Sequence, residues 1–249
     1  MTARPQDIDQ ILQTWAYTPG AISARKLRTD SGREVVQMRI EMGVLQMEVD
    51  GRPDGTHPEG AATYLDYLIQ QNAASDGPLV LSEEQCVELD CEFVQYYHRR
   101  MCWLALRDFG LAVVDADHTL AMMDFAAAHS PDSQWTLGHE QYRPFVLFHR
   151  TQAAALTALE RTGADSAIEE INRGLQQLRG IFREAEAEEQ FDADEQVAQL
   201  VRLKEWLREE YHVGQTLEEQ LAEAVAAEQY ERAAQLRDQI ARRSDYKHA

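Results

Sequence analysis

The sequence has no apolar run long enough to cross a membrane, because charged residues interrupt each apolar stretch well before about 18 residues. Its start, MTARPQDIDQ, is polar and lacks the apolar core of a secretory signal. Cysteine is scarce, and a count of 3 is odd in a chain of 249 residues, which can fold without disulfides. These absences predict a cytoplasmic protein that does not bind membranes.

Catalytic signatures are also missing. The sequence has no G-x-x-x-x-G-K phosphate loop, no G-x-S-x-G nucleophile elbow and no H-E-x-x-H zinc motif. Asp115, Asp117 and His118 cluster, but on a helix their side chains would point to different sides. We therefore expect no enzymatic activity, no catalytic residue and no cofactor. An enzyme of unknown type in the helical part of the chain is the alternative.

Candidate metal ligands have an unsuitable spacing. Cys91, His98 and Cys102 would lie along one face of a predicted helix. Helical rise places Cys91 about 10 Å from His98, whereas the ligands of a zinc ion lie within about 4 Å of each other. We therefore expect buried free cysteines and no metal site.

Basic residues are few, and the formal net charge is −19. Residues 56–215 contain 28 acidic and 12 basic residues, a charge that repels nucleic-acid phosphates and anionic membrane surfaces. The N-terminal strands hold a local basic cluster, of which Arg25, Lys26 and Arg28 are the candidate phosphate or nucleic-acid contacts. A solvated strand edge explains the same charges. Nucleic acid is therefore not the expected partner, and a DNA-repair accessory is the alternative.

The N-terminal 57 residues predict a short helix followed by antiparallel strands. Apolar residues at helical spacing predict a helix over 7–16, and alternating apolar residues predict strands over 21–29 and 34–42. The apolar positions are even-numbered before Gly43 and odd-numbered after it. We interpret Gly43 as a β-bulge in one bent strand. A tight turn at Met42-Gly43, which would give three strands, is the alternative.

From residue 58 onward the sequence predicts helices. Ser82 and Gln85 form a capping box before the longest of them. We expect helices over residues 82–106, 109–128, 140–161, 165–189 and 194–211.

Two segments of this helical region resemble the tetratricopeptide repeat. Small residues recur at Ala112 and Thr119 in the first segment and at Ala167 and Gly174 in the second. Their separation exceeds the standard repeat of about 34 residues, so ordinary packing of helix hairpins explains them equally well. In both interpretations antiparallel helices stack and leave a groove.

The C-terminal segment TLEEQLAEAVAAEQYERAAQLRDQIARR, residues 216–243, predicts two short helices, over 216–228 and 230–243, with Thr216 and Glu219 as a capping box. It resembles the UVR motif, a helical hairpin of the excision-repair proteins UvrB and UvrC, of Clp-type chaperone ATPases and of regulators of protein-arginine kinases. The matching residues are Leu221, Ala224, Val225, Tyr230, Glu231, Ala233, Ala234, Leu236, Arg237, Asp238 and Ile240. The resemblance implies a pairing module without catalysis.

The residue pattern of this segment supports a binding role independently. Ala233 and Ala234 permit a close approach of two helices. The apolar seam is formed by Leu217, Leu221, Val225, Leu236 and Ile240. A hairpin this short cannot bury that seam alone, so we expect a second copy or another protein to cover it. Gly214 is expected to separate the hairpin as a mobile part. The candidate partner-binding residues are Leu221, Val225, Tyr230, Ala233, Ala234, Leu236, Arg237, Asp238 and Ile240.

Taken together, the patterns predict a mainly α-helical chain with a small N-terminal antiparallel β-sheet, an α+β protein. We expect three parts, over residues 1–57, 58–213 and 214–249. The predicted function is a non-enzymatic adaptor or scaffold that binds proteins through a helical groove and the hairpin. The resemblance implies a link to excision repair, or to the regulation of a Clp protease or a protein kinase. The partner would be another protein with a UVR motif or a second copy of the chain.

Overall fold

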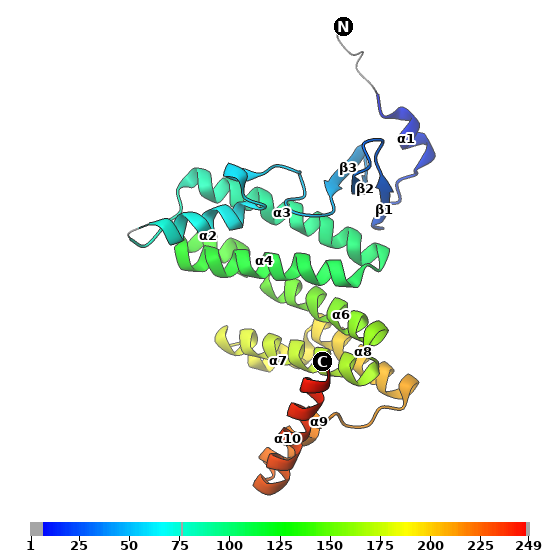
Figure 1. The fold of residues 1–249 in the computed structure, drawn as a ribbon, viewed down its shortest axis with the longest axis vertical. Helices are drawn as coiled ribbons and strands as arrows, with labels where there is room; N and C mark the ends of the chain where they lie inside the picture. Colours follow the sequence, from blue (N-terminus) through cyan, green and yellow to red (C-terminus); the bar gives the residue numbers. More distant parts are fainter. Residues whose placement is uncertain (1–6, 76, 248–249) are drawn as a thin grey trace. The chain divides into compact units, whose positions relative to one another are not determined.

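The computed structural model describes residues 7–75 and 77–247, and within 242–247 it describes the backbone alone. These residues form two compact units, which divide between Ala153 and Ala154. Most of the described chain is helical, and a small antiparallel sheet lies near the N-terminus (Figure 1). The predicted fold class is therefore confirmed, whereas the predicted three-part division stays a prediction.

In the described part of the chain, each helix is too short or too polar to cross a lipid bilayer.

The N-terminal unit begins with α1 (Asp9–Thr14) and a three-stranded antiparallel sheet of order β1-β2-β3. The strands are β1 (Ser23–Arg28), β2 (Glu34–Ile40) and β3 (Gly43–Glu48). The turn between β1 and β2 contains Gly32, whose φ of 85° is one that glycine adopts without a steric cost. The apolar side chains of Val35, Val36 and Met47 in this sheet are buried.

The β-bulge expected at Gly43 is wrong, and the three-strand alternative is right. Ile40 pairs with Gly43, so Glu41 and Met42 form a tight turn between two strands. A two-residue turn pairs even-numbered residues of β2 with odd-numbered residues of β3, as in Val36 with Met47. The even-numbered apolar residues of β2 and the odd-numbered ones of β3 therefore lie on the same face of the sheet. The guanidinium of Arg39 donates hydrogen bonds to the carbonyl oxygens of Glu41 (3.3 Å) and Gly43 (3.0 Å). This long side chain stabilises a turn that lacks the usual turn residues.

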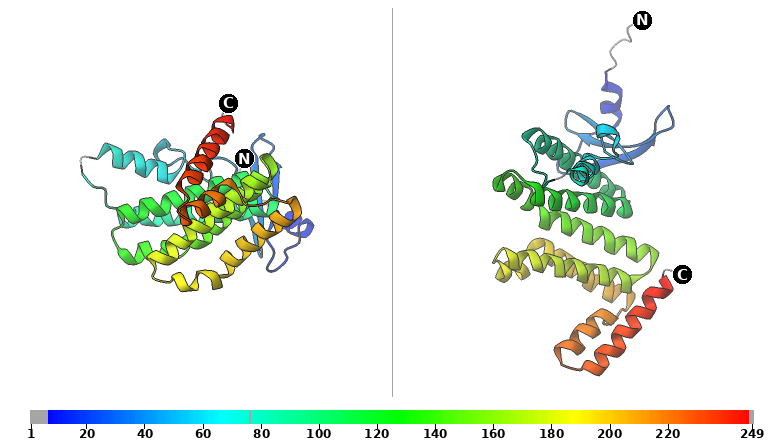
Figure 2. Two further views of the ribbon diagram at one scale, coloured as in Figure 1. Left: turned by 90° about the horizontal axis from the view of Figure 1, so that it is seen from below. Right: turned by 60° about the vertical axis from the view of Figure 1, so that its left-hand side comes forward.

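Helices complete the N-terminal unit. They are the 3-10 turn η1 (Pro58–Gly60), α2 (Tyr64–Ala74), α3 (Glu83–Leu106), α4 (Phe109–His129), α5 (Ser133–Glu140) and the first part of α6 (Arg143–Arg161). The predicted capping box of Ser82 and Gln85 is present at the start of α3. Helices α3 and α4 lie side by side and antiparallel (Figure 2). The hydrophobic core between α2, α3 and α4 contains Leu68, Leu89 and Met122, which have no exposed surface.

No helix was predicted between residues 128 and 140, where α5 lies. This helix has no buried residue, so it lacks the apolar periodicity by which helices are predicted. Its first turn is capped instead by Asp132, whose side chain accepts a hydrogen bond from the amide of Gln134 (3.1 Å).

The C-terminal unit contains the end of α6, α7 (Ala164–Glu184), η2 (Glu188–Ala193), α8 (Glu195–Tyr211), α9 (Leu217–Ala226) and α10 (Tyr230–Lys247). Ile168, Ile171 and Leu200 are buried within it. Helix α7 ends before the predicted residue 189, because Glu186 takes a positive φ of 55° and the chain turns there. The small residues Ala167 and Gly174 are buried on α7, as stacked helices require. The arrangement is consistent with helical repeats.

Candidate functional site

The C-terminal hairpin consists of α9 and α10. The amide of Glu219 donates to Oγ1 of Thr216 (3.3 Å), and the amide of Thr216 donates to Oε2 of Glu219 (3.0 Å). These reciprocal bonds are the predicted capping box, which satisfies amides that the first turn of α9 leaves free. Between the helices Glu228 takes a positive φ of 56°, and α10 begins at Tyr230.

The inside of the hairpin is a small apolar cluster of its own. Ala224, Ala233 and Leu236 are buried there, and Leu217 and Leu221 pack against them. Ala233 therefore occupies the contact between α9 and α10, as the sequence analysis expected. Ala234 is exposed and lies outside this contact, so its expected role in binding a partner stays a prediction. Neighbouring positions on a helix point in different directions, and only one alanine can face the partner helix.

Other residues of the motif are open to solvent. Tyr230 is 69% exposed and Val225 is 53% exposed, which are high values for large apolar side chains. Tyr230 and Ala234 lie four residues apart on α10 and therefore share one of its faces. Ideal helical geometry of an antiparallel pair places Val225 of α9 on the same side of the hairpin. We call Val225, Tyr230 and Ala234 the open face.

The remaining candidate residues of the motif flank these two regions. Arg237 and Asp238 are exposed, with 3.8 Å between Nε of Arg237 and Oδ1 of Asp238. Ile240 is half-buried. The nine residues selected from the sequence thus divide into an interior group and a solvent-exposed group, which the sequence pattern did not distinguish.

Glu219 attaches the hairpin to the rest of the C-terminal unit. Its Oε1 accepts a hydrogen bond from Nδ2 of Asn172 on α7 (3.0 Å) and forms an ion pair with Arg208 on α8. Lys204 of α8 in turn donates to Oδ1 of Asn172 (3.3 Å). These contacts fix the start of the hairpin to α7 and α8. Gly214 had instead been expected to separate the hairpin as a mobile part.

The carboxylate of Glu219 is held in its charged form. Burial alone would raise its pKa, but the hydrogen bonds from Thr216 and Asn172 and the charge of Arg208 outweigh burial. The pKa of Glu219 therefore lies below its usual value.

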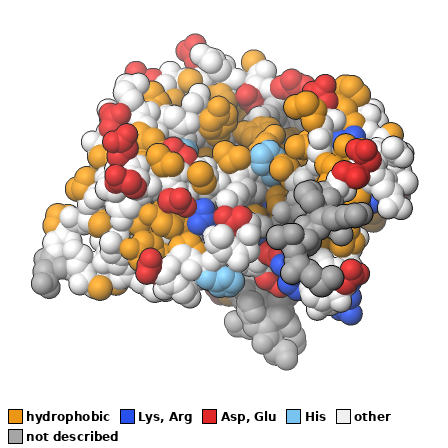
Figure 3. Space-filling model, turned by 90° about the horizontal axis from the view of Figure 1, so that it is seen from above, with side chains coloured by type: hydrophobic (Ala, Val, Ile, Leu, Met, Phe, Trp, Pro, Cys, Tyr) orange, Lys and Arg blue, Asp and Glu red, His pale blue; other side chains and the backbone are white. Residues whose placement is uncertain are grey.

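The basic residues of β1 do not form a single phosphate site. Alternation along a strand places Lys26 and Arg28 on one face of the sheet and Arg25 on the other. Nζ of Lys26 lies 3.1 Å from Oδ2 of Asp108. Arg25 donates to Gln37 and lies over the Trp15 ring, and Arg28 lies 3.8 Å from Glu34. On the face drawn in Figure 3, acidic side chains are widely scattered and basic ones are few.

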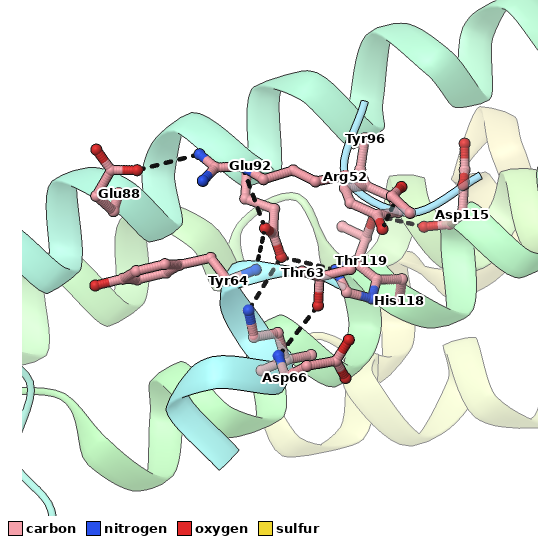
Figure 4. Close-up of polar contacts among 12 residues, drawn as sticks. Arg52, Thr63, Tyr64, Asp66, Glu88, Glu92, Tyr96, Asp115, His118 and Thr119 are labelled. Atoms are coloured by element: carbon pink, nitrogen blue, oxygen red, sulfur yellow. Dashed lines mark hydrogen bonds and ion pairs between the residues drawn. The ribbon is translucent and has the colours of Figure 1, made fainter. Parts of the chain in front are cut away.

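A polar network that the sequence analysis missed surrounds Glu92 of α3 (Figure 4). This carboxylate has no exposed surface. Its Oε2 accepts a hydrogen bond from the amide of Tyr64 (2.6 Å), and its Oε1 accepts one from the amide of Leu65 (3.2 Å). Nε2 of His118 lies 2.9 Å from Oε1, and Nε of Arg52 lies 3.5 Å from Oε2. Glu92 thus caps the N-terminus of α2 from α3, the next helix along the chain.

The side chains of Asp115, Asp117 and His118 each bind a different partner. Asp115 forms a two-pronged ion pair with Arg99, at 2.7 and 2.9 Å. Asp117 binds Arg150, and His118 binds Glu92. The three side chains therefore serve three separate contacts within the N-terminal unit.

The free cysteines are Cys86, Cys91 and Cys102. Cys86 and Cys102 are buried, as expected, but Cys91 is exposed, so the prediction of burial is wrong there. Burial raises the pKa of the Cys102 thiol to about 12, which makes it a poor nucleophile or metal ligand. Over the described residues, no group of three or more histidine, cysteine and acidic side chains could hold a metal ion.

Comparison with known proteins identifies the hairpin. The family model described as "UvrB/uvrC motif" matches residues 215–243. No curated protein and no solved structure matches the chain. The match begins next to the Thr216 capping box and ends within α10, so it covers the hairpin and not the helices before it. The chain carries a C-terminal UVR motif.

Proposed function

We propose that this chain is a non-enzymatic adaptor that binds another protein through the open face of its UVR hairpin. The observation that carries the proposal is the match of residues 215–243 to the UvrB/uvrC motif, since UVR motifs generally mediate contacts between proteins. Val225 and Tyr230 lie within that match and are largely exposed.

The packing of the hairpin supports a role of the open face in binding. Ala224, Ala233 and Leu236 already join α9 to α10, so folding of the hairpin does not require Tyr230 or Val225. Tyrosine is enriched among the residues that dominate binding energy at protein interfaces, because its ring buries a large area at a low cost in side-chain entropy. Ala234 beside it offers a small side chain over which a partner helix can approach closely.

The partner that suits this face is a second helical hairpin with a UVR motif. It belongs either to another protein or to a second copy of this chain. Excision repair is the setting that the motif suggests first, and regulation of a Clp protease or of a protein kinase are the others. The helical stacks would supply a further contact.

Charge substitutions on the open face test the proposal. Tyr230→Glu and Ala234→Glu should each weaken self-association in sedimentation, or capture by immobilised UVR hairpins from UvrB-type proteins, at least tenfold. Gln239→Glu is the matched control, because Gln239 is exposed on the opposite flank of α10 and receives the same charge. Circular dichroism should give equal helical content for all variants. If the wild-type chain neither self-associates nor binds such hairpins, or if the variants bind equally well, the proposal is wrong.

Nucleic-acid binding through Arg25, Lys26 and Arg28 has less support. These cations lie on two faces of β1, and Lys26 already pairs with Asp108. The net charge of −19 of the chain also opposes the approach of a phosphate backbone.

A further inference from the structure

A cavity of about 680 Å³ lies within the N-terminal unit, where α3, α4, α5 and the start of α6 meet. Its size is in the range of pockets that enclose small organic ligands. The wall is formed mainly by apolar and aromatic side chains, namely Phe93, Val94, Tyr97, Met123, Phe145 and Val146. Such a wall favours an apolar ligand body.

Arg100 places a positive charge in this apolar wall. It lines the cavity, yet it is only 1% exposed. Its Nη1 donates a hydrogen bond to Oγ1 of Thr119 (2.9 Å), whereas Nε has no hydrogen-bond partner among the described residues. The Nε–Nη2 edge of a guanidinium is a fork that matches the two oxygens of a carboxylate.

No acidic side chain of the described residues neutralises Arg100 within 4.0 Å. Asp115, the acid whose charge acts on it, is bound by both prongs of Arg99 and by Nε1 of Trp103 (3.0 Å). Burial therefore lowers the pKa of Arg100 to about 10, which still leaves it charged at neutral pH. A buried cation without a counter-ion is costly, and a bound anion would remove that cost.

A second unpartnered nitrogen belongs to His149 of α6. This histidine is 7% exposed, and its Nδ1 has no hydrogen-bond partner in the described part of the chain. Burial and the charge of Arg100 lower its pKa to about 4, so it is neutral at pH 7 beside that cation. Arg100 and His149 together leave buried polar groups unsatisfied in a way that folded proteins usually avoid.

We propose that this cavity binds a small monocarboxylate with an apolar body. The carboxylate pairs with the guanidinium of Arg100, and the body lies against Phe93, Met123 and Phe145.

The far end of the cavity limits the ligand to one negative charge. Asp90 lines the cavity on the same helix as Arg100, and the helical rise separates their backbones by about 15 Å. The carboxylate of Asp90 is held by Nε2 of His139 (2.8 Å) and Nε1 of Trp135 (3.0 Å). A dicarboxylate of matching length would bring its second charge towards Asp90.

Isothermal titration calorimetry of the full chain with octanoate and with 1-octanol tests the charge requirement, because these probes share their alkyl chain. We expect octanoate to bind at least tenfold more tightly than 1-octanol. Arg100→Met should abolish this preference while 1-octanol binds as before. The variant should fold, because methionine keeps much of the volume and removes an unpaired charge. Arg100→Lys, which keeps the charge but not the fork, should retain part of the preference.

A cavity-filling variant locates the site. Met123→Trp should reduce the affinity for both probes, and octanoate should raise the melting temperature of the wild type but not of this variant. Equal binding of the two probes, no binding of octanoate, or unchanged preference in Arg100→Met would overturn the proposal. Binding of an apolar peptide with a free C-terminal carboxylate, without binding of octanoate, would also overturn it in favour of a peptide site. The wild-type comparison of the probes stands even if a variant fails to fold.

Discussion

Two carboxylates cap helices in the two units of this molecule, and they do so in different ways. Glu219 binds the amide of Thr216, its near neighbour at the start of α9. Glu92 binds the amides of Tyr64 and Leu65 at the start of α2, although it belongs to α3. Glu219 stays partly exposed, with 21% of its side chain open to solvent, whereas Glu92 has no exposed surface.

The difference shows that contacts between residues close in the sequence can be predicted from it, whereas contacts between residues far apart cannot. A capping box has a fixed local spacing, so Thr216 and Glu219 were recognisable in the sequence. No spacing rule relates Glu92 to Tyr64. The first carboxylate stabilises a local turn and then gains tertiary contacts, while the second one exists as a cap only because α2 packs on α3.

Glu92→Ala should have the largest effect on stability. It removes the buried one of the acidic partners of Arg52 and leaves two buried amides of α2 without partners. Breaking a buried pair in this way costs about 3–5 kcal/mol. Urea denaturation of the full chain measures the change. Glu88→Ala is the control, since Glu88 binds the same Arg52 from a half-exposed position and should cost less than about 1 kcal/mol.

The adjacent alanines of α10 offer a second contrast, between the inside of the hairpin and its open face. Ala233→Glu should destabilise the hairpin by about 2–4 kcal/mol, because it places a large charged side chain in the contact with α9. Ala234→Glu should change stability by no more than about 0.5 kcal/mol. Hydrogen exchange of the α9 and α10 amides distinguishes the two variants. Equal protection in both would mean that Ala233 does not form the contact.

Glu219→Ala should have an intermediate effect. The loss of a helix cap costs about 0.5–2 kcal/mol, and the contacts with Asn172 and Arg208 are lost with it. We expect faster hydrogen exchange in the first turn of α9, with the N-terminal unit unaffected. Glu223→Ala, an exposed position on the same helix, serves as the control. If α9 exchanges equally fast in both variants, Glu219 does not anchor the hairpin.

The same carboxylate gives the hairpin a dependence on acid. The pKa of Glu219 is lower in the folded chain than its usual value, because its hydrogen bonds and Arg208 outweigh the effect of burial. Its contribution is therefore complete above the unfolded pKa of about 4.3 and is lost as the pH falls through the lower folded value. Protection of α9 should decrease over that window in the wild type. Glu219→Gln should show a weaker decrease.

The smallest expected effect is at Gly43. Its φ is not positive, and a Cβ built there would lie 3.9 Å from the side chain of Ile40, an ordinary contact. Gly43→Ala should therefore change the free energy of unfolding by less than about 0.5 kcal/mol. Gly32→Ala, at a φ of 85°, should cost about 1–2 kcal/mol and is the comparison. A large loss of unfolding free energy in Gly43→Ala but not in Gly32→Ala would favour the β-bulge interpretation.

The sequence determined the features that rest on neighbouring residues. Helical periodicity and the Ser82 and Thr216 capping boxes located most helices within a few residues, and the UVR resemblance at residues 216–243 agrees with the family match. These predictions succeeded because each depends on interactions within one or two helical turns. The short helix α5 was not predicted, because it buries no residue and so has no periodic apolar pattern.

Only the tertiary structure decided which residues meet across long stretches of chain. It separated the buried Ala233 from the exposed Ala234, attached Glu219 to Asn172 and brought Glu92 to α2. It also left Arg100, in the wall of an apolar cavity, without an acidic partner among the described residues. Burial, and with it the pKa and binding potential of a charged group, depends on the helices that pack around it. That packing leaves no periodic mark in the sequence.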